Sequence, residues 1–306
     1  MGGCLVLIYH RVTELENDPF QLAISPAKFK SQIEYLKKKM HILTLGEFLN
    51  RIKQNDSLSN CVLITFDDGY ADNFIQAKPI LEQLETPAVF FITTGMINKN
   101  KEFWWDELEK LFYSTQSLSS AQLAHIIRKK YSWDINHSEN RQNILFRVHR
   151  YLKILPYEKR EKVLDDLFNL VEHNRNSIRP THRIMNADEI RDLSHQEFFE
   201  IGSHSMNHCA FKSLSRSASK HEIEYSKNVL ESISGHSIVS FCYPFGLKHD
   251  LSRRAARMIR KAGYSCAFTN IPGLFFRNDN IFKISRCLVR NWDVSELKEN
   301  LLINYS

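Results

Sequence analysis

Short apolar runs recur along this chain of 306 residues, and segments with helical periodicity separate them. The runs predicted as strands are 4–9, 62–66, 88–93, 199–202, 239–243 and 265–269. The helices predicted between the first of these runs are 26–39, 45–53 and 77–84. The first of these helices follows Ser25, a capping residue, and has Pro26 at its first position. This alternation is typical of an α/β fold with a parallel sheet or barrel.

The middle of the chain breaks this alternation. Residues 100–183 contain no glycine and no clear strand pattern, and their apolar positions follow the period of amphipathic helices. The helices predicted there are 104–113, 120–131, 140–152 and 157–174. We therefore expect a helical insertion over 99–185 on an α/β body formed by 1–98 and 186–306.

The composition is that of an ordinary soluble protein, with 43% hydrophobic and 25% charged residues. No apolar stretch approaches the roughly 20 residues that span a bilayer, and residues 1–10 lack the basic flank and cleavage site of a secretory leader. We therefore expect a cytoplasmic protein, with peripheral contact at the inner membrane as an option. The six cysteines form no C-x-x-C pair, which favours reduced and buried thiols.

The formal net charge of +6 is modest for this length. It fits an anionic lipid surface, a phosphate-bearing substrate or a solvated basic face. No nucleic-acid-binding motif accompanies the charge, so we do not expect nucleic acid as a partner.

Two adjacent carboxylates end one of the predicted strands. Asp67 and Asp68 follow an apolar run directly, and adjacent like charges resist ionisation unless a cation or separate roles distinguish them. His204 and His208 follow another apolar run, four positions apart. One Asp and two His would form an open, three-ligand zinc-type site, with the second Asp free to act as a base. The ordinary alternatives are a turn whose Asp caps the next helix and unrelated histidines, but the joint pattern favours a metal-dependent hydrolase.

Candidate chemical groups follow the carboxyl ends of several predicted strands. They are His10, Asp67–Asp68, His204–His208 and Pro244–Gly246. In parallel α/β sheets and barrels, this edge is where ligands and catalytic groups gather. We therefore expect these segments to meet at one rim.

These segments resemble the motifs of the polysaccharide deacetylase family, which comprises carbohydrate esterases with a NodB-like homology domain. Thr65–Gly69 is similar to the first motif of the family, His204–His208 matches its H-[ST]-x-x-H motif, and Cys242–Gly246 is similar to its R-x-P-[YF] motif. Leu7–Val12 resembles the N-terminal Y-H segment of the biofilm-polysaccharide deacetylases, a branch of the family. The resemblance covers residues 1–98 and 186–290 and leaves the helical middle outside the common core.

The resemblance implies a fold and a set of roles. The fold would be a distorted (β/α) barrel of the NodB type with a helical insertion. Asp68, His204 and His208 would hold a divalent ion, for which we expect Zn²⁺, and Asp67 would be the general base. By analogy, the backbone N–H of Phe245 would stabilise the oxyanion.

The third motif also contributes Tyr243 and Pro244, which we place beside the substrate together with Phe245. Tyr243, Phe245 and Trp292 would suit sugar-stacking walls, but aromatic residues near strand ends more often serve packing. Both interpretations stay open at this point.

The chain departs from the family pattern at two positions. The family protonates the leaving amine with a His in a late L-x-H motif, and the stretch 284–289 contains no His. His10 is our candidate replacement, because the first and last strands of a closed barrel are neighbours. Cys242 stands where many members have the Arg that orients the base, and a thiol lacks that fork of donors. Arg286 or Arg11 would restore the positive charge, and we favour Arg286.

The predicted function is metal-dependent removal of N-acetyl groups from an amino sugar. The partner would be an N-acetylated glycan, either a polysaccharide or a lipid-linked or nucleotide-linked precursor of cell-envelope glycan biosynthesis. The same barrel hosts hydrolases of other amide or cyclic-amide substrates, which the motifs do not distinguish. A non-catalytic glycan-binding module is a further alternative, because Cys242 and the missing late His depart from the catalytic pattern.

Overall fold

The computed structural model describes residues 2–99, 101–114, 119–131, 140–172 and 174–303. It divides into two compact units, Met1–Lys99 with Ile184–Ser306, and Asn100–Arg183. The first unit is an α/β body and the second is helical. The candidate site described below lies within the first unit.

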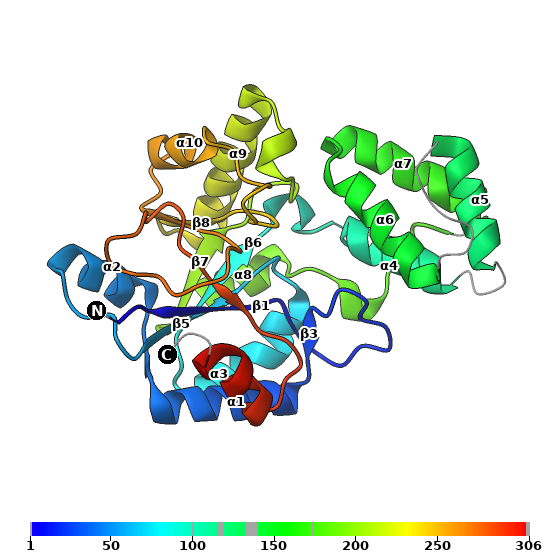
Figure 1. Cartoon of the computed structure of the whole chain (residues 1–306). Helices are drawn as coiled ribbons and strands as arrows, with labels where there is room; N and C mark the ends of the chain where they lie inside the picture. Colours follow the sequence, from blue (N-terminus) through cyan, green and yellow to red (C-terminus); the bar gives the residue numbers. More distant parts are fainter. Residues whose placement is uncertain (1, 100, 115–118, 132–139, 173, 304–306) are drawn as a thin grey trace. The chain divides into compact units, whose positions relative to one another are not determined.

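Parallel strands form the main sheet of the first unit (Figure 1). Their order is β10 (Cys287–Leu288), β1 (Leu5–Tyr9), β5 (Cys61–Phe66), β6 (Ala88–Ile92), β7 (Phe199–Ser203), β8 (Ser240–Cys242) and β9 (Cys266–Phe268), and β4 (His41–Ile42) also pairs with β5. Cys287 pairs with Leu7 of β1, while Ile284 forms a parallel bridge to Phe268 of β9. The segment 284–288 therefore links both edges of the curled sheet, and the structure confirms the predicted α/β fold of a distorted barrel.

The strand bounds differ from the predicted ones by at most two residues. The strands that the sequence pattern did not reveal are very short: β4, and the pair β2 (Arg11–Val12) and β3 (Ala23–Ile24), which form a separate parallel sheet. A strand of two residues shows no alternation of apolar and polar positions, so periodicity cannot identify it.

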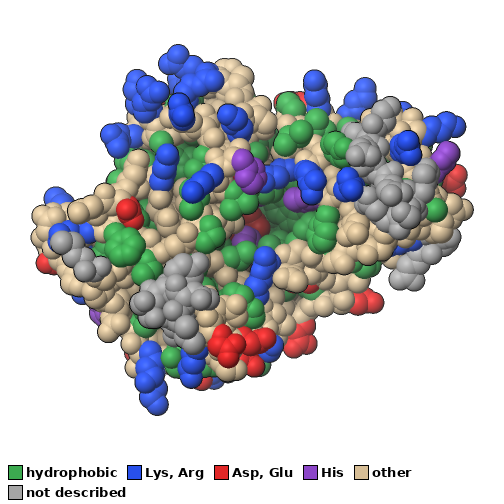
Figure 2. Space-filling model, viewed as in Figure 1, with side chains coloured by type: hydrophobic (Ala, Val, Ile, Leu, Met, Phe, Trp, Pro, Cys, Tyr) green, Lys and Arg blue, Asp and Glu red, His purple; other side chains and the backbone are tan. Residues whose placement is uncertain are grey.

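Helices surround the sheet. They are α1 (Pro26–Lys39), α2 (Leu45–Gln54), α3 (Lys78–Gln83), α8 (Ala187–Ser194), α9 (Arg216–Ser234), α10 (Ala255–Lys261) and α11 (Val294–Leu297). The Ser25 side chain accepts a hydrogen bond from the N–H of Lys28 and caps α1, as the sequence predicted. The helix predicted over 77–84 is preceded by a π-helical turn, Asn73–Ala77. Figure 1 shows α9 and α10 on one side of the sheet and α1 and α3 on the other, and Lys and Arg side chains gather over α9 and α10 in Figure 2.

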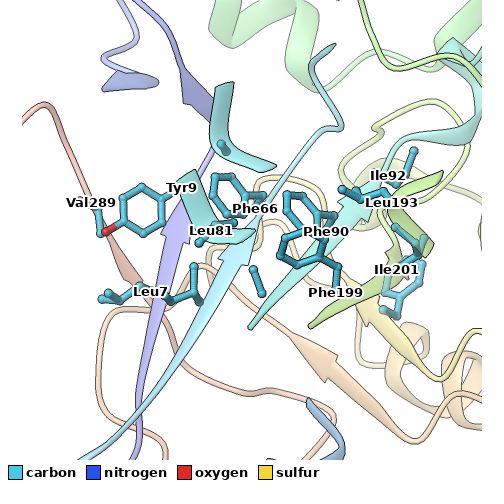
Figure 3. Close-up of a cluster of buried hydrophobic side chains, with 14 of the residues drawn as sticks. Leu7, Tyr9, Phe66, Leu81, Phe90, Ile92, Leu193, Phe199, Ile201 and Val289 are labelled. Carbon is cyan, nitrogen blue, oxygen red and sulfur yellow. The ribbon is translucent and has the colours of Figure 1, made fainter. Parts of the chain in front are cut away.

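Both faces of the sheet are buried. Leu7 and Tyr9 of β1 pack in one apolar cluster, whereas Val6 belongs to a second cluster on the other face. In the first cluster, the rings of Phe66 and Phe90 stack with their centroids 4.8 Å apart (Figure 3). Burial on both sides is why the strands read as continuous apolar runs. All six cysteines are buried free thiols, which confirms the prediction made from their spacing.

The second unit consists of α4 (Trp104–Ser114), α5 (Ser120–Tyr131), α6 (Arg141–Lys153) and α7 (Tyr157–Leu170). The helix predicted to reach residue 174 ends at Leu170, and residue 173 lies outside the described residues. Half-buried Arg179 and Arg175 form ion pairs with the buried Glu102 at 2.8 Å and Glu107 at 2.7 Å, and these pairs link the end of the unit to its beginning. Among the described residues of either unit, no helix has the length and apolar character needed to cross a bilayer.

Candidate active site

The structure brings the predicted site residues to one rim of the barrel. His10 follows β1, Asp67–Asp68 follows β5, His204 follows β7, and Phe245 lies three residues beyond the end of β8. Arg286 precedes β10 and so lies at the amino end of that strand, and its long side chain reaches Asp67 from there. The other residues share one edge for a simple reason. Because the strands are parallel, their carboxyl ends lie at the same edge of the sheet.

Asp68, His204 and His208 form a compact, buried trio. Asp68 Oδ1 lies 3.5 Å from His204 Nε2 and 3.2 Å from His208 Nε2. One potential ligand atom from each residue lies within 4.8 Å of the others. These distances suit three ligands that surround a single divalent ion and leave a position open on it.

The charge and orientation of the potential ligand atoms in this trio favour the binding of a cation. No described residue gives the buried Oδ1 of Asp68 a properly aligned hydrogen bond, although the two imidazoles lie close to it. His204 Nδ1 lies 2.9 Å from the carbonyl oxygen of Cys242, an acceptor that fixes the proton on Nδ1 and leaves Nε2 to face the trio. Burial acts to raise the pKa of Asp68, but the two imidazoles outweigh it and hold that pKa well below its usual range. The residues therefore fit a divalent metal ion.

A second group of potential ligands, Asp67, His204 and Cys242, also lies close together. Both carboxylate oxygens of Asp67 accept hydrogen bonds from Arg286, and Arg286 also donates to the Cys242 sulfur at 2.9 Å. A guanidinium already occupies this place, so a second cation is disfavoured there. The trio around Asp68 is the better metal site.

Left-handed backbone conformations orient several groups of the site. Asp68 has φ = 73°, His208 has φ = 49° and Phe245 has φ = 60°, values that cost a non-glycine residue on the order of 1 kcal/mol each. Hydrogen bonds hold these turns in place: Thr93 N–H donates to the Asp68 carbonyl at 3.1 Å, and His208 N–H donates to Ser205 Oγ at 3.2 Å. Such strain is concentrated at functional sites because the surrounding structure must enforce it.

Asp67 and Arg286 form a buried, bidentate ion pair. Arg286 Nη1 donates to Asp67 Oδ1 at 2.8 Å and Nη2 donates to Oδ2 at 2.7 Å, and Arg286 is only 1% exposed. The guanidinium is itself held by the Thr269 carbonyl at 2.8 Å and by Thr65 Oγ1 at 2.9 Å. Burial acts to raise the pKa of Asp67, but Arg286 outweighs it and lowers the pKa to about 2. The carboxylate is therefore ionised and fixed in orientation at neutral pH.

Of the two arginines considered from the sequence, Arg286 is the one that contacts Asp67. Arg11 is also buried, but its Nε donates to Asp72 Oδ2 at 3.0 Å and its guanidinium stacks on the ring of Tyr70. The thiol of Cys242 lies 3.5 Å from the Asp67 carboxylate. This small side chain leaves room for the guanidinium of Arg286, which extends from the amino end of β10 at the other edge of the sheet.

His10 lies beside the two carboxylates. The preceding residue, Tyr9, accepts a hydrogen bond from the Asp67 N–H at 2.9 Å. Burial lowers the pKa of His10, and the charges of Asp68 and Asp67 oppose that effect. Its Nδ1 atom is buried and has no hydrogen-bond partner among the described residues. The neutral form of the imidazole is therefore favoured before substrate binds.

The third motif separates into packing residues and a residue of the site. Tyr243 is 2% exposed, lies in the apolar core and donates a hydrogen bond from its hydroxyl to the Phe282 carbonyl, which favours the packing role over the sugar-stacking role that was also open for it. Pro244 is buried as well. The half-buried ring of Phe245 lies edge-on to that of His208, with centroids 4.7 Å apart. Trp292 is half-buried and packs against the core.

Glu222 is a residue of the site that the sequence analysis missed. From the buried face of α9, it accepts hydrogen bonds from the N–H groups of Met206 and Asn207 at 2.9 and 2.8 Å, between the two histidines of the trio. The opposite side of this turn is held by Gly95 N–H, which donates to the Met206 carbonyl at 2.8 Å. One feature of the sequence could have identified Glu222: it is the single acid among apolar and small residues on the inner face of a helix. A buried charge without a partner is unfavourable, so such an acid is expected to have one.

Comparison with known protein families gives a match to the family described as Polysaccharide deacetylase, over residues 54–149 and 149–267. These segments make up more than half of the chain. A curated relative, YxkH of Bacillus subtilis (strain 168), has a name that describes it as a polysaccharide deacetylase; it is 26% identical over 123 residues, which are 40% of this chain and 43% of that protein. The alignment thus spans less than half of that relative.

Solved structures with a similar fold cover nearly the whole chain. The Streptococcus pyogenes deacetylase PplD in complex with acetate superposes with a TM-score of 0.63 at 13% identity, over 98% of both chains. A de-N-acetylase from Aggregatibacter actinomycetemcomitans gives 0.61 at 17% identity, over 97% of this chain and 99% of the other. IcaB from Ammonifex degensii gives 0.60 at 17% identity, over 94% and 92%. At these identities the likeness concerns the fold.

Proposed function

Because the chain belongs to the polysaccharide deacetylase family, we propose that it hydrolyses the acetamide group of an N-acetylated amino sugar in a metal-dependent reaction. The observation that carries the proposal is the buried trio of Asp68, His204 and His208 beside Asp67, a carboxylate that Arg286 holds ionised. This combination supplies a place for a Lewis acid and a separate base at the same rim.

The trio would hold the ion, and we favour zinc because one carboxylate and two imidazoles are typical ligands for it. A bound zinc ion would lower the pKa of its water to about 7 and polarise the carbonyl of the substrate. The carbonyl of Cys242 keeps His204 in the tautomer that presents Nε2 to such an ion.

The residues around the trio have separate roles in this proposal. Asp67 accepts the proton of the attacking water, since its carboxylate is ionised and aligned by Arg286. The backbone N–H of Phe245 donates to the oxyanion that forms at the acetamide carbon. His10 protonates the amine as the carbon–nitrogen bond breaks, after its imidazole has taken up a proton in the presence of substrate.

Two alternatives were open from the sequence. The case for a non-catalytic glycan-binding module rested on Cys242 and the missing late His, and it is weaker now that Arg286 provides the charge beside Asp67. Hydrolysis of another amide or cyclic amide uses the same chemistry, so the choice between them depends on the substrate assay. We propose an N-acetylated glycan, or a lipid-linked or nucleotide-linked precursor, as the substrate and the cytoplasmic side of the inner membrane as the location.

The test is acetate release from soluble N-acetylglucosamine oligomers and from cyclic amides. We expect acetate from the oligomers only, loss of activity after exhaustive chelation and recovery with added zinc. Asp67→Asn should lower kcat by about 10²- to 10⁴-fold, the range typical of a lost general base. Asp72→Asn is the matched control, because Asp72 is also a buried carboxylate paired with an arginine, and it should remain active. Full activity of the chelated protein would refute metal dependence.

A further inference from the structure

A dense group of cations lies on α9, on α10 and on the segments that directly precede these two helices. The segments 211–220 and 247–261 carry nine Lys or Arg residues and one acid, a net charge of +8, whereas the whole chain carries only +6. The cations, which we call the basic face, are Lys212, Arg216, Lys220, Lys248, Arg253, Arg254, Arg257, Arg260 and Lys261. All nine side chains are exposed, and Figure 2 shows Lys and Arg gathered over these helices. Asp250, the acid, is buried and accepts a hydrogen bond from the Leu247 N–H.

The basic face contains a groove of ≈ 610 Å³ between α9 and α10. Arg216, Lys220 and Lys261 line it, together with Glu224 and the apolar side chains of Ile223 and Met258. Lys220 pairs with a neighbouring glutamate at 3.6 Å, but no carboxylate of the described residues lies within 4 Å of the charged nitrogens of Arg216 or Lys261. Lys220 offsets the charge of Glu224, which leaves Arg216 and Lys261 as the uncompensated cations of the groove. Two such cations above an apolar floor suit a phosphate group that is attached to an apolar chain.

The basic face also adjoins the candidate active site. Leu247, which is 38% exposed, lies two residues after Phe245 and directly before Lys248. An exposed apolar side chain among cations is typical of surfaces that contact membranes, because it enters the interface while the cations attract anionic headgroups.

We propose that the basic face docks this protein on the surface of an anionic phospholipid bilayer, with the groove between α9 and α10 taking the phosphate of a lipid headgroup. Docking through this face would hold the rim of the barrel near the lipid surface. The proposal does not depend on the reaction that the site catalyses.

The test is co-sedimentation of the whole protein with vesicles. We expect binding to vesicles of equal parts phosphatidylcholine and phosphatidylglycerol, weak binding to phosphatidylcholine alone, and loss of binding at high salt. The triple variant Arg253→Gln, Arg257→Gln and Lys261→Gln should bind the anionic vesicles about a hundredfold more weakly. A control triple variant with the same change in net charge, Lys38→Gln, Lys39→Gln and Lys53→Gln, should bind as the unmodified protein does.

Several outcomes would overturn the proposal. Equal losses in both triple variants would mean that only net charge matters, and equal binding to both kinds of vesicle would exclude recognition of anionic headgroups. Binding to heparin or DNA without binding to vesicles would mean that the basic face binds a soluble polyanion and not a membrane. Thermal unfolding and acetate release from soluble oligomers should be the same in all three proteins, which separates failure of this proposal from failure of the proposed reaction.

Discussion

Replacing Arg286 with lysine tests the role of the ion pair between Arg286 and Asp67. Arg286 donates two parallel hydrogen bonds to the Asp67 carboxylate and one each to Thr65 and Thr269. Lysine keeps the positive charge, but its ammonium donates from a single point and cannot form the parallel pair. Arg286→Lys therefore changes geometry much more than charge.

The expected loss of stability follows from the lost contacts. A hydrogen bond to a charged group contributes roughly 1.5–3 kcal/mol. Losing one of the parallel pair and one of the bonds that hold the guanidinium should lower the free energy of unfolding by about 3 kcal/mol at neutral pH. The base would also be less well aligned, and misplacement of a catalytic group by about 1 Å lowers turnover by about 10²-fold.

The pH dependence has a definite sign. The folded-state pKa of Asp67 is about 2, below the unfolded value of about 3.9, so ionised Asp67 contributes stability that is present above about pH 4 and is lost as the pH falls towards 2. This contribution amounts to about 2 kcal/mol. In Arg286→Lys the weaker pairing lets burial raise the folded-state pKa. The difference in stability between the two proteins should therefore narrow as the solution is acidified.

The assay is urea unfolding of the chelated proteins at neutral pH and at about pH 3, followed by circular dichroism, together with the pH profile of kcat/KM for the zinc-loaded proteins. Arg11→Lys is the matched control, because Arg11 is equally buried and pairs with Asp72. Arg11→Lys should lower the free energy of unfolding, but it should leave the decrease of kcat/KM at acidic pH as it is in the unmodified protein. If Arg286→Lys retained the stability, the rate and this acidic decrease of the unmodified protein, the ion pair would have no role in orienting the base.

Three further predictions concern the rest of the site. Glu222→Gln should weaken zinc affinity by about 10- to 100-fold in competition with a chromophoric chelator, because Glu222 fixes the turn between the two histidines; unchanged affinity would contradict this role. Gly95→Ala would place a Cβ atom 2.5 Å from the Met206 carbonyl oxygen and should cost about 1–3 kcal/mol in urea unfolding, whereas Gly46→Ala, whose nearest neighbour is 3.9 Å away, should not destabilise the protein. His10→Ala should retain zinc but lower kcat by about 10²- to 10⁴-fold, and a normal rate would remove His10 from the mechanism.

The chemical groups at the strand ends could be anticipated from the sequence because they follow apolar runs. Each run predicts a buried strand, and parallel strands place their carboxyl ends together, so Asp67, Asp68 and His204 were expected at one rim before any distance was known. The barrel itself is confirmed by the structure and by its solved relatives. The roles of these residues remain predictions until the variants above are measured.

Other features depended on contacts between distant segments. The choice between Arg11 and Arg286 required knowing that residues 284–288 bridge the two edges of the sheet, a link that no local pattern encodes. Glu222 was missed because its partners, the backbone N–H groups of Met206 and Asn207 and the side-chain amide of Asn207, lie on another segment of the chain, and no local pattern pairs them with it. Tyr243 follows a strand, as a substrate residue would, but its ring turns into the core, and motif position alone does not determine the direction of a side chain.

The segment that closes the barrel also brings Arg286 to Asp67. Segment 284–288 is made after β1 and must pair with it, and because Leu7 and Cys287 are 280 positions apart, this non-local contact forms slowly. A nascent protein that has not reached this segment would have its acids and histidines but no partner for Asp67. Hydrolytic competence should therefore appear only once translation has passed the final strand, and prematurely terminated products should be inert.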